Sequence, residues 1–220
     1  MSQASQVRIY DPTASIVFRK TNEQFGGLSN MAPGYPILIG GVQIRTSEAL
    51  YQACRFPHMP DVQRLIFAQY SPMTAKMRTK PFRHESRTDW NSVRVNIMRW
   101  CLRVKLAQNW QKFSELLLMT GDQPIVELSH KDDFWGAKVA DRGTLVGMNV
   151  LGRLLMELRE ELKQEPHASL NIIKPLLISD FLLLNQPIEA VYADRSFSPK
   201  QGEKKQEHSL SFVPAQYDLI

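Results

Sequence analysis

Two neighbouring carboxylates, an indole, a glycine and an amine lie together in residues 132–138 of the chain. Asp132 and Asp133 could move a proton or hold a ribose hydroxyl, and Trp135 could stack on a flat ring. Gly136 would let a ligand approach the backbone closely, because glycine has no Cβ. This mixture predicts an acid–base site for a flat, polar ligand, although the aspartates could instead serve turn or capping chemistry.

A third carboxylate, Glu48, lies in the first turn of a predicted helix, about one turn before Tyr51 and Gln52. One interpretation is a carboxylate that suits the dipole of the helix. The other is an anion that stabilises positive charge on a sugar, beside a ring and an amide on the same face. Trp90, near the start of a later helix, could equally pack in the core or stack on a base.

Basic side chains crowd the region from Lys76 to Arg87, where Glu85 is the single acid. The net charge of +5 is mildly basic and does not by itself indicate a nucleic-acid-binding protein. The cluster, which includes Arg78, could be a solvated face or an edge that contacts phosphates. Lys138 could likewise be solvated, hold a phosphate or attack a sugar carbon.

The composition limits the class of protein. The chain has 220 residues, 43% of them hydrophobic, which is enough for one sizeable core or one domain with an appendage. It has neither an apolar run near the roughly 20 residues of a membrane span nor a signal peptide. We therefore expect a cytoplasmic protein in which Cys54 and Cys101 stay reduced. Metal-ligand spacings and Walker or dinucleotide motifs are missing from the sequence, so we expect no metal and no cofactor.

The apolar pattern predicts mostly helices with a few short strands. The expected strands are 16–18, a hairpin over 36–45 that turns at Gly40 and Gly41, and 125–128. The expected helices cover 48–54 after a cap at Thr46 or Ser47, 62–69, a short stretch after Ser71, a long stretch from a cap at Thr88 to Gly121, and 149–162. Residues 1–14 would form a loose arm, 15–165 the domain, and 166–220 a C-terminal extension in which 198–209 is mobile.

Several short motifs follow one another over residues 16–162. They are Leu28-Ser29-Asn30, Thr46-Ser47-Glu48-Ala49-Leu50-Tyr51-Gln52-Ala53, Ser71-Pro72-Met73-Thr74-Ala75-Lys76, Trp90, Met98 with the Lys105 segment, Ile125-Val126-Glu127, Asp132-Asp133-Phe134-Trp135-Gly136 and the helix 149–159. In this order and spacing they resemble the YbiA-like, or NADAR, family. The resemblance implies a compact, mostly helical α+β single domain with a small antiparallel sheet, and cleavage of N-glycosidic bonds. It also implies two kinds of substrate: phosphorylated early riboflavin intermediates, and ADP-ribose attached to guanine, including in nucleic acid.

The same resemblance suggests the residues of the site. By the family pattern, Glu48, Trp90 and an aspartate of the tryptophan–glycine loop would form it, and Asp132 is the better-matched aspartate. Some members carry an acid directly after that glycine, where this chain has an alanine and then Lys138. We therefore expect Glu48, Asp132, Trp90 and Lys138 to be catalytic. The expected substrate-binding residues are Asn30, Tyr51, Gln52, Lys76, Arg78, Glu127, Asp133, Trp135, Gly136 and Asn149.

Breaking a ribosyl–nitrogen bond requires an anion near the sugar, a proton donor near the base and an activated water. Glu48 and Asp132 could share these tasks, and two tryptophans, Trp90 and Trp135, could sandwich the base. Phosphates would bind to Lys76, Arg78 and Lys138, and a second route would form a transient imine on Lys138 or Lys76.

The leading hypothesis is removal of ADP-ribose from guanine bases of nucleic acid or nucleotides. One alternative is hydrolysis of the phosphorylated riboflavin intermediates. Others are a non-catalytic module that binds ADP-ribose, and a scaffold with residues 166–220 as an interaction module. No membrane partner is expected.

Overall fold

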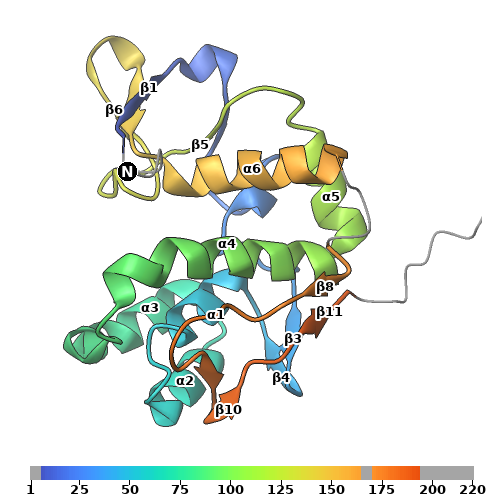
Figure 1. The fold of residues 1–220 in the computed structure, drawn as a ribbon. Coiled ribbons are helices and arrows are strands. Elements are labelled where there is room, and N and C mark those ends of the chain that lie inside the picture. Colours follow the sequence, from blue (N-terminus) through green and yellow to red (C-terminus); the bar gives the residue numbers. More distant parts are fainter. Residues whose placement is uncertain (1–5, 165–169, 194–220) are drawn as a thin grey trace, which may run out of the picture.

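The fold is built around one long helix, α4 (Trp90–Gln108), which lies between two other helices (Figure 1). The computed structural model describes residues 6–164 and 170–193. Helix α6 (Val150–Gln164) packs along one side of α4, and α1 (Ser47–Ala53) packs along another. Because α4 is covered on more than one side, its buried residues are spread around the helix and do not form a single stripe.

The remaining elements are short. The other helices are α2 (Pro60–Phe67), α3 (Pro72–Thr79) and α5 (Trp110–Leu118), with 3-10 helices at Pro12–Ala14, Gly26–Leu28, Lys80–Glu85 and Asp141–Gly143. The strands are β1 (Arg8–Tyr10), β2 (Ile16–Phe18), β3 (Ile37–Ile39), β4 (Val42–Ile44), β5 (Ile125–Glu127), β6 (Lys138–Val139), β7 (Leu145–Gly147), β8 (Ile172–Ile173), β9 (Leu182–Leu183), β10 (Gln186–Pro187) and β11 (Val191–Tyr192). Within the described ranges, no helix combines the length and the apolarity needed to cross a membrane.

Two predicted helix starts are confirmed by their caps. The side chain of Thr46 accepts a hydrogen bond from the backbone N–H of Ala49 at 3.2 Å, where α1 begins. Ser71 caps α3 in the same way, with Pro72 as the first helical residue. The short polar side chains therefore satisfy backbone donors that the helices themselves leave unpaired.

The prediction of one helix from a cap at Thr88 to Gly121 is wrong at its start and its middle. Asp89 occupies the position before the first residue of α4. The helix stops at Asn109, whose φ of −134° and ψ of 44° cannot continue it, and α5 begins at the next residue. The Asn109 amide donates to the backbone oxygen of Lys105 at 3.1 Å, so the side chain stabilises the break.

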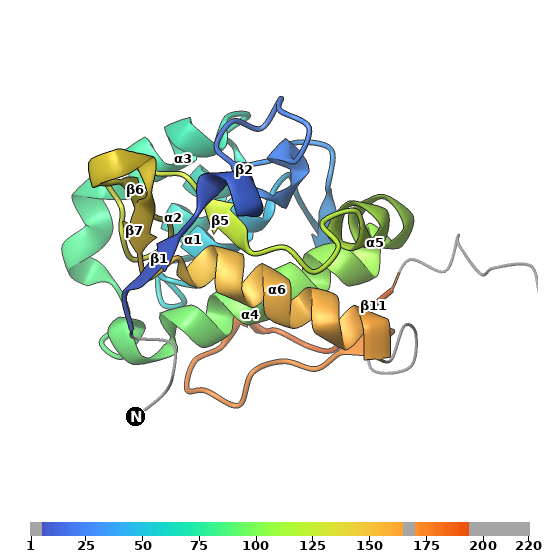
Figure 2. The ribbon, with the colours of Figure 1, turned by 90° about the horizontal axis from the view of Figure 1, so that it is seen from above.

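A three-stranded antiparallel sheet in the order β1–β7–β6 confirms the expected small sheet. Seen from above, its strands gather at the end of the molecule where α6 begins (Figure 2). The loose arm predicted for residues 1–14 is wrong for Arg8–Tyr10, because these residues pair with Leu145–Gly147. Strands β3 and β4 form the predicted hairpin, with Gly40 and Gly41 at φ values of 53° and 78°.

The N-terminal half of the chain also pairs with β5, the strand that precedes the loop carrying Trp135. Strand β2 pairs in parallel with β5, and Ile16 lies opposite Ile125. Local patterns predict the two strands but not this pairing, since a parallel pair joins segments far apart in the sequence. The pairing fixes Glu127 at the end of β5, opposite Phe18.

The described part of the C-terminal extension, 170–193, packs on α4 and α2. The indole of Trp100 donates to the backbone oxygen of Lys174 at 2.9 Å, and its ring meets Phe181 edge-on with centroids 5.0 Å apart. The buried Gln63 amide bonds backbone groups of this segment. Residues 170–193 therefore contribute to the hydrophobic core. The segment 198–209, expected to be mobile, lies outside the described residues.

Candidate active site

Side chains from separate segments lie within electrostatic range of one another. Several of them lie near the beginnings of α4 and α6, which are at the same end of the molecule (Figure 1). An acidic group consists of Glu48 on α1, Glu127 at the end of β5 and Asp132 in the following loop. These carboxylates influence one another electrostatically, and Lys76 on α3 acts on both glutamates. We call these four residues the carboxylate cluster.

Glu48 is held in the interior, with 7% of its surface exposed. The amide of Gln52 donates to its carboxylate at 2.9 Å, and its backbone N–H bonds the backbone oxygen of Asn30 at 3.1 Å. Burial raises the pKa of Glu48. Lys76 and the hydrogen bond from Gln52 oppose this shift, and Asp132 adds to it. Gln52, predicted to bind substrate, orients this carboxylate.

Glu127 is the carboxyl most suited to exchange a proton near neutral pH. Burial raises its pKa to about 7, Glu48 and Asp132 add to the shift, and Lys76 opposes it. A carboxyl in this range can donate a proton and later accept one. From the sequence, Glu127 was predicted to bind substrate, and no role in proton transfer was predicted. A glutamate at a strand end gives no local sign that other carboxylates lie nearby.

Asp132 shapes the loop that carries Trp135. One of its oxygens accepts from the backbone N–H of Phe134 at 3.0 Å and from that of Trp135 at 2.9 Å. This is the turn chemistry considered as the alternative for Asp132. The residue nevertheless remains close enough to raise the pKa of Glu48 and Glu127. It therefore combines a local structural contact with membership of the cluster.

Aromatic rings border the carboxylate cluster. Tyr51 contacts Trp90 with ring centroids 5.0 Å apart and meets Trp135 edge-on at 5.6 Å. Trp90 is buried, whereas Trp135 is only partly buried and also contacts Phe134. Trp90 and Trp135 were expected to sandwich a base. Tyr51 contacts both indoles, and the three rings form one aromatic wall. Trp135 is the more accessible indole of this wall.

Two asparagines predicted to bind substrate have side chains that contact groups inside the protein. The Asn149 side chain, with no exposed surface, accepts from the N–H of Glu127 at 3.1 Å and donates to the oxygen of Ile125 at 2.8 Å. Asn30 is buried, and its amide points at the sulfur of Met98 at 2.7 Å. Their polar groups are engaged inside the protein, so we regard both as positioning residues.

Close packing explains why position 136 is a glycine, and the sequence did not reveal this. A Cβ at this position would lie 2.5 Å from the backbone oxygen of Glu127. Gly147 shows the same constraint, because a Cβ there would lie 2.4 Å from the oxygen of Gly136. Gly136 was predicted to let a ligand approach the backbone. It instead lets the backbone of β5 approach closely, so the loop packs tightly against that strand.

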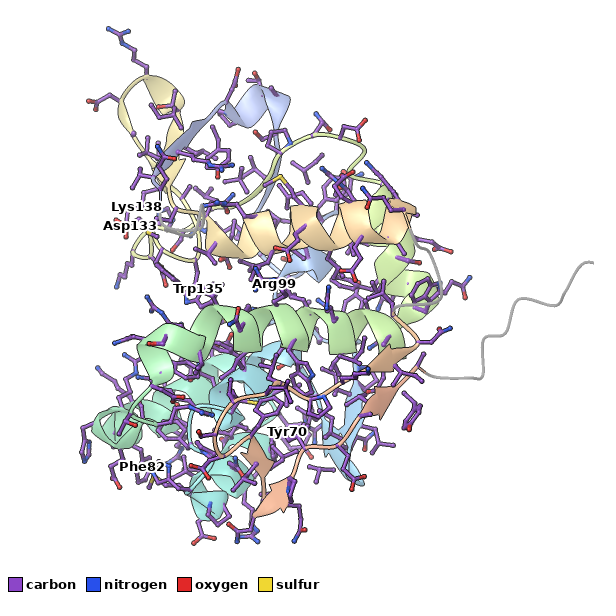
Figure 3. All side chains as sticks on the ribbon, viewed as in Figure 1. Tyr70, Phe82, Arg99, Asp133, Trp135 and Lys138 are labelled. Carbon is purple, nitrogen blue, oxygen red and sulfur yellow. The ribbon has the colours of Figure 1, made fainter. Side chains whose placement is uncertain are left out.

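Lys138 and Asp133 lie apart from the carboxylate cluster. They form an exposed ion pair of 2.7 Å at one edge of the molecule (Figure 3). Neither is among the groups that shift the pKa of Glu48 or Glu127. Arg78 is exposed on α3. This placement does not favour the expected catalytic role of Lys138, or its attack on a sugar carbon.

Lys105 is a buried amine, named from the sequence only as part of a motif. It is fully buried, and its amine donates to the backbone oxygens of Gly27 at 2.6 Å and Ser29 at 3.1 Å. The rings of Tyr35 and Phe113 lie 4.3 and 4.2 Å from the amine. Burial holds the Lys105 pKa well below its usual value. Lys105 therefore fixes the loop that leads to Asn30 and Glu48.

Two surface cavities lie outside the cluster. One of about 310 Å³ lies between α4 and β8 and includes Arg99 and Arg103. The other, of about 690 Å³, borders residues 84–89 before α4. Among residues 6–164 and 170–193, no three His, Cys, Asp or Glu side chains converge as possible metal ligands.

An α+β domain that buries interacting carboxylates beside an aromatic wall has the features of an enzyme site, where perturbed pKa values concentrate. The chain belongs to the NADAR domain family, whose model matches residues 17–163. The family and the mostly helical α+β fold expected from the motifs are thus confirmed.

Several relatives have functional names. The N-glycosidase YbiA of Escherichia coli is 35% identical over 153 residues, which are 68% of this chain and 89% of the relative. An N-glycosidase of Nostoc punctiforme is 34% identical over 151 residues, covering 68% and 93%. A riboflavin biosynthesis protein of Vibrio vulnificus is 35% identical over 159 residues, 72% of this chain, but the match spans only 41% of that longer protein. The NMR structure of E. coli YbiA superimposes with a TM-score of 0.57 at 32% identity, over 70% of this chain and 91% of YbiA.

Proposed function

We propose that the protein is an N-glycosidase that hydrolyses a ribosyl–nitrogen bond without a cofactor. The observation that carries the proposal is a pair of glutamates, the buried Glu48 and the partly buried Glu127, with raised pKa values around one lysine, Lys76. Carboxyl pairs of this kind supply an anion and a proton in glycoside hydrolysis. The relatives named N-glycosidases support the same chemistry.

Glu48 is the anion in this mechanism. Burial raises the pKa of Glu48 and opposes its ionisation, whereas Lys76 and the hydrogen bond from Gln52 favour the ionised form. A carboxylate in a dry site stabilises positive charge strongly, because little water screens it. Glu48 would therefore face the sugar, where positive charge develops as the bond to nitrogen lengthens.

Glu127 is the proton carrier. When the bond between sugar carbon and base nitrogen breaks, its electron pair stays with the base, and the Glu127 carboxyl donates a proton to the base. Water then attacks the sugar carbon and gives a proton to the Glu127 carboxylate, which restores the enzyme. Glu127 takes this role in place of Asp132, because an oxygen of Asp132 already accepts two backbone N–H groups.

The aromatic wall would bind the departing base. Trp135 is partly exposed beside Tyr51, so a flat base can stack on it next to the carboxylates. Stacking of this kind contributes about 1–3 kcal/mol per base. Asp132 supports this binding by fixing the backbone N–H of Trp135.

The substrate we favour is ADP-ribose attached to guanine in nucleic acid or in nucleotides. Net charge +5 and the basic residues between Lys76 and Arg87 suit a phosphate-rich substrate. A second candidate is a phosphorylated early riboflavin intermediate, favoured by the name of the Vibrio vulnificus relative. Both contain a ribosyl phosphate joined to nitrogen, so the proposed bond cleavage is the same.

A non-catalytic module that binds ADP-ribose is the rival function. It requires the wild-type protein to bind ADP-ribosylated guanine and leave it intact. The test is to incubate wild type and Glu48→Gln with guanine-ADP-ribosylated DNA and, separately, with a phosphorylated aminopyrimidine intermediate of riboflavin synthesis. Release of the free sugar phosphate by wild type alone supports the glycosidase. Binding of either compound without release by wild type supports the binding module.

A further inference from the structure

Arg55 and Arg94 lie over aromatic rings, and Arg83 lies within electrostatic range of Arg55. Arg55 follows Cys54 at the end of α1, Arg83 belongs to the 3-10 helix Lys80–Glu85, and Arg94 lies in the second turn of α4. The Arg94 guanidinium lies 3.8 Å from the ring centroid of Phe134, and that of Arg55 lies 5.2 Å from the ring of Trp90. We call Arg55, Arg83 and Arg94 the arginine group.

The positive charge of the arginine group is not neutralised within the described chain. No ion pair joins Arg55, Arg83 or Arg94 to a carboxylate of residues 6–164 or 170–193, whereas Arg99 on the same helix as Arg94 pairs with Glu157. The Nε atom of Arg94 is buried and has no hydrogen-bond partner there. A buried donor without an acceptor is costly, so the group is arranged for an anion that comes from outside.

Repulsion inside the group supports this interpretation. Burial lowers the pKa of Arg55, and Arg83 and then Arg94 lower it further, with Tyr51 opposing them. Arginines that stack on aromatic faces keep their N–H groups in the ring plane, where a ligand can reach them. The Nε of Arg55 donates to the Ser86 hydroxyl at 2.6 Å, so its terminal nitrogens are the donors that could face a ligand. Planar guanidinium groups with free N–H donors match the oxygens of a phosphate, often with two parallel hydrogen bonds.

Tyr51 links the arginine group to the carboxylate cluster. Burial raises its pKa, Glu48 raises it further, and Arg94 and Arg55 lower it. The phenol therefore lies within electrostatic reach of the glutamate and of the arginines. In a ribosyl phosphate, the carbon bonded to nitrogen and the carbon that carries the phosphate lie on opposite sides of the ring oxygen. A sugar with its reacting carbon at Glu48 and its phosphate at the arginines would span the two charged groups that act on Tyr51.

We infer that Arg55, Arg83 and Arg94 form the subsite for the phosphate of the ribosyl substrate. This inference rests on the proposed glycosidase function. It replaces the phosphate contacts expected from the sequence, because Arg78 and Lys138 point to solvent or to a surface partner. The shared ligand chemistry is a phosphate ester on the sugar, present as a monophosphate in one candidate substrate and as a diphosphate in the other.

The test compares full-length wild type with Arg94→Ala and the control Arg99→Ala. Both variants lose one arginine from α4, but Arg99 pairs with Glu157 away from the wall. Calorimetric titrations at low salt use ADP-ribose, ribose 5-phosphate and ribose. Loss of a charge-assisted contact weakens binding about 10- to 100-fold. We expect Arg94→Ala to weaken binding of whichever phosphate ligand wild type prefers by this factor, and Arg99→Ala to change it less than about twofold.

The exposed Arg83 provides a second variant that leaves the partly buried Arg55 and Arg94 in place. Arg83→Ala should weaken phosphate binding about threefold or more and change no other property of the protein. Equal phosphate affinity in wild type, Arg94→Ala and Arg83→Ala would overturn the subsite, even if the enzyme hydrolyses its substrate. Arginine-dependent phosphate binding without any bond cleavage would support the subsite and contradict the glycosidase. Preference for ADP-ribose or for ribose 5-phosphate distinguishes the two substrate kinds.

Discussion

Replacing Glu127 by glutamine should change stability in a pH-dependent way. The pKa of Glu127 is raised from 4.5 to about 7, first by burial and then by Glu48 and Asp132. A carboxyl with a raised folded pKa binds more protons in the folded state. Its stabilising contribution is therefore complete below the unfolded value and is lost as the pH rises through the folded value of about 7. The ionised form above this range is disfavoured by roughly 3 kcal/mol at most.

Glutamine keeps the size of the side chain but cannot ionise, so Glu127→Gln removes this penalty. We expect its free energy of unfolding, relative to wild type, to rise by about 1–3 kcal/mol between roughly pH 4 and roughly pH 8. Urea denaturation at the two pH values measures the difference. Glu115→Gln, at an exposed position of α5, is the control and should show no such rise. A stability difference for Glu127→Gln that does not change with pH would refute the reasoning.

The same variant tests the proton-transfer role. Glu127→Gln should lower kcat by about 10²- to 10⁴-fold, the range for loss of a general acid or base. In wild type, kcat/KM should decline as the pH rises above about 7, because Glu127 loses the proton that it donates. Unchanged turnover by Glu127→Gln would remove Glu127 from the mechanism.

Three further substitutions have definite expected outcomes. Gly136→Ala should lower the free energy of unfolding by about 2 kcal/mol or more, measured in urea, because its Cβ would meet the backbone oxygen of Glu127 at 2.5 Å; an unchanged midpoint would contradict the tight packing. Lys138→Ala should change kcat less than about twofold and stability by about 0.5 kcal/mol or less, since Lys138 pairs with Asp133 at the surface; a large loss of kcat would restore its catalytic role. Lys105→Met should destabilise the protein by about 1–3 kcal/mol in the same urea assay, because two loop carbonyls lose their donor; wild-type stability would show that these bonds contribute little.

Local features were predictable because short-range chemistry determines them. Thr46 and Ser71 cap helices with side chains suited to that task, and Gly40-Gly41 adopts the positive φ values of a tight turn. The motifs also identified Glu48 and Asp132, and both belong to the carboxylate cluster. In these cases the residue type and its immediate neighbours contain the information.

Long-range convergence was not predictable from one sequence. Arg55 and Arg94 show no local sign of a ring partner, and only tertiary packing places Arg55 over Trp90 of α4 and Arg94 over Phe134 in the loop after β5. Asn149 resembles a helix cap, but its amide crosses to β5 and holds the backbone of Glu127. The raised pKa of Glu127 likewise depends on burial and on carboxylates from other segments. Hydrophobic periodicity contains no record of such contacts.

The most direct test of the proposed chemistry follows the bond itself. Wild type and Glu48→Gln are incubated with guanine-ADP-ribosylated DNA and with a phosphorylated riboflavin intermediate, and the products are identified by mass spectrometry. Wild type should release a free sugar phosphate and an intact base from at least one substrate, and Glu48→Gln should do so at least about 100-fold more slowly. Two intact substrates after incubation with wild type, or equal rates for the two proteins, would contradict a glycosidase that uses Glu48.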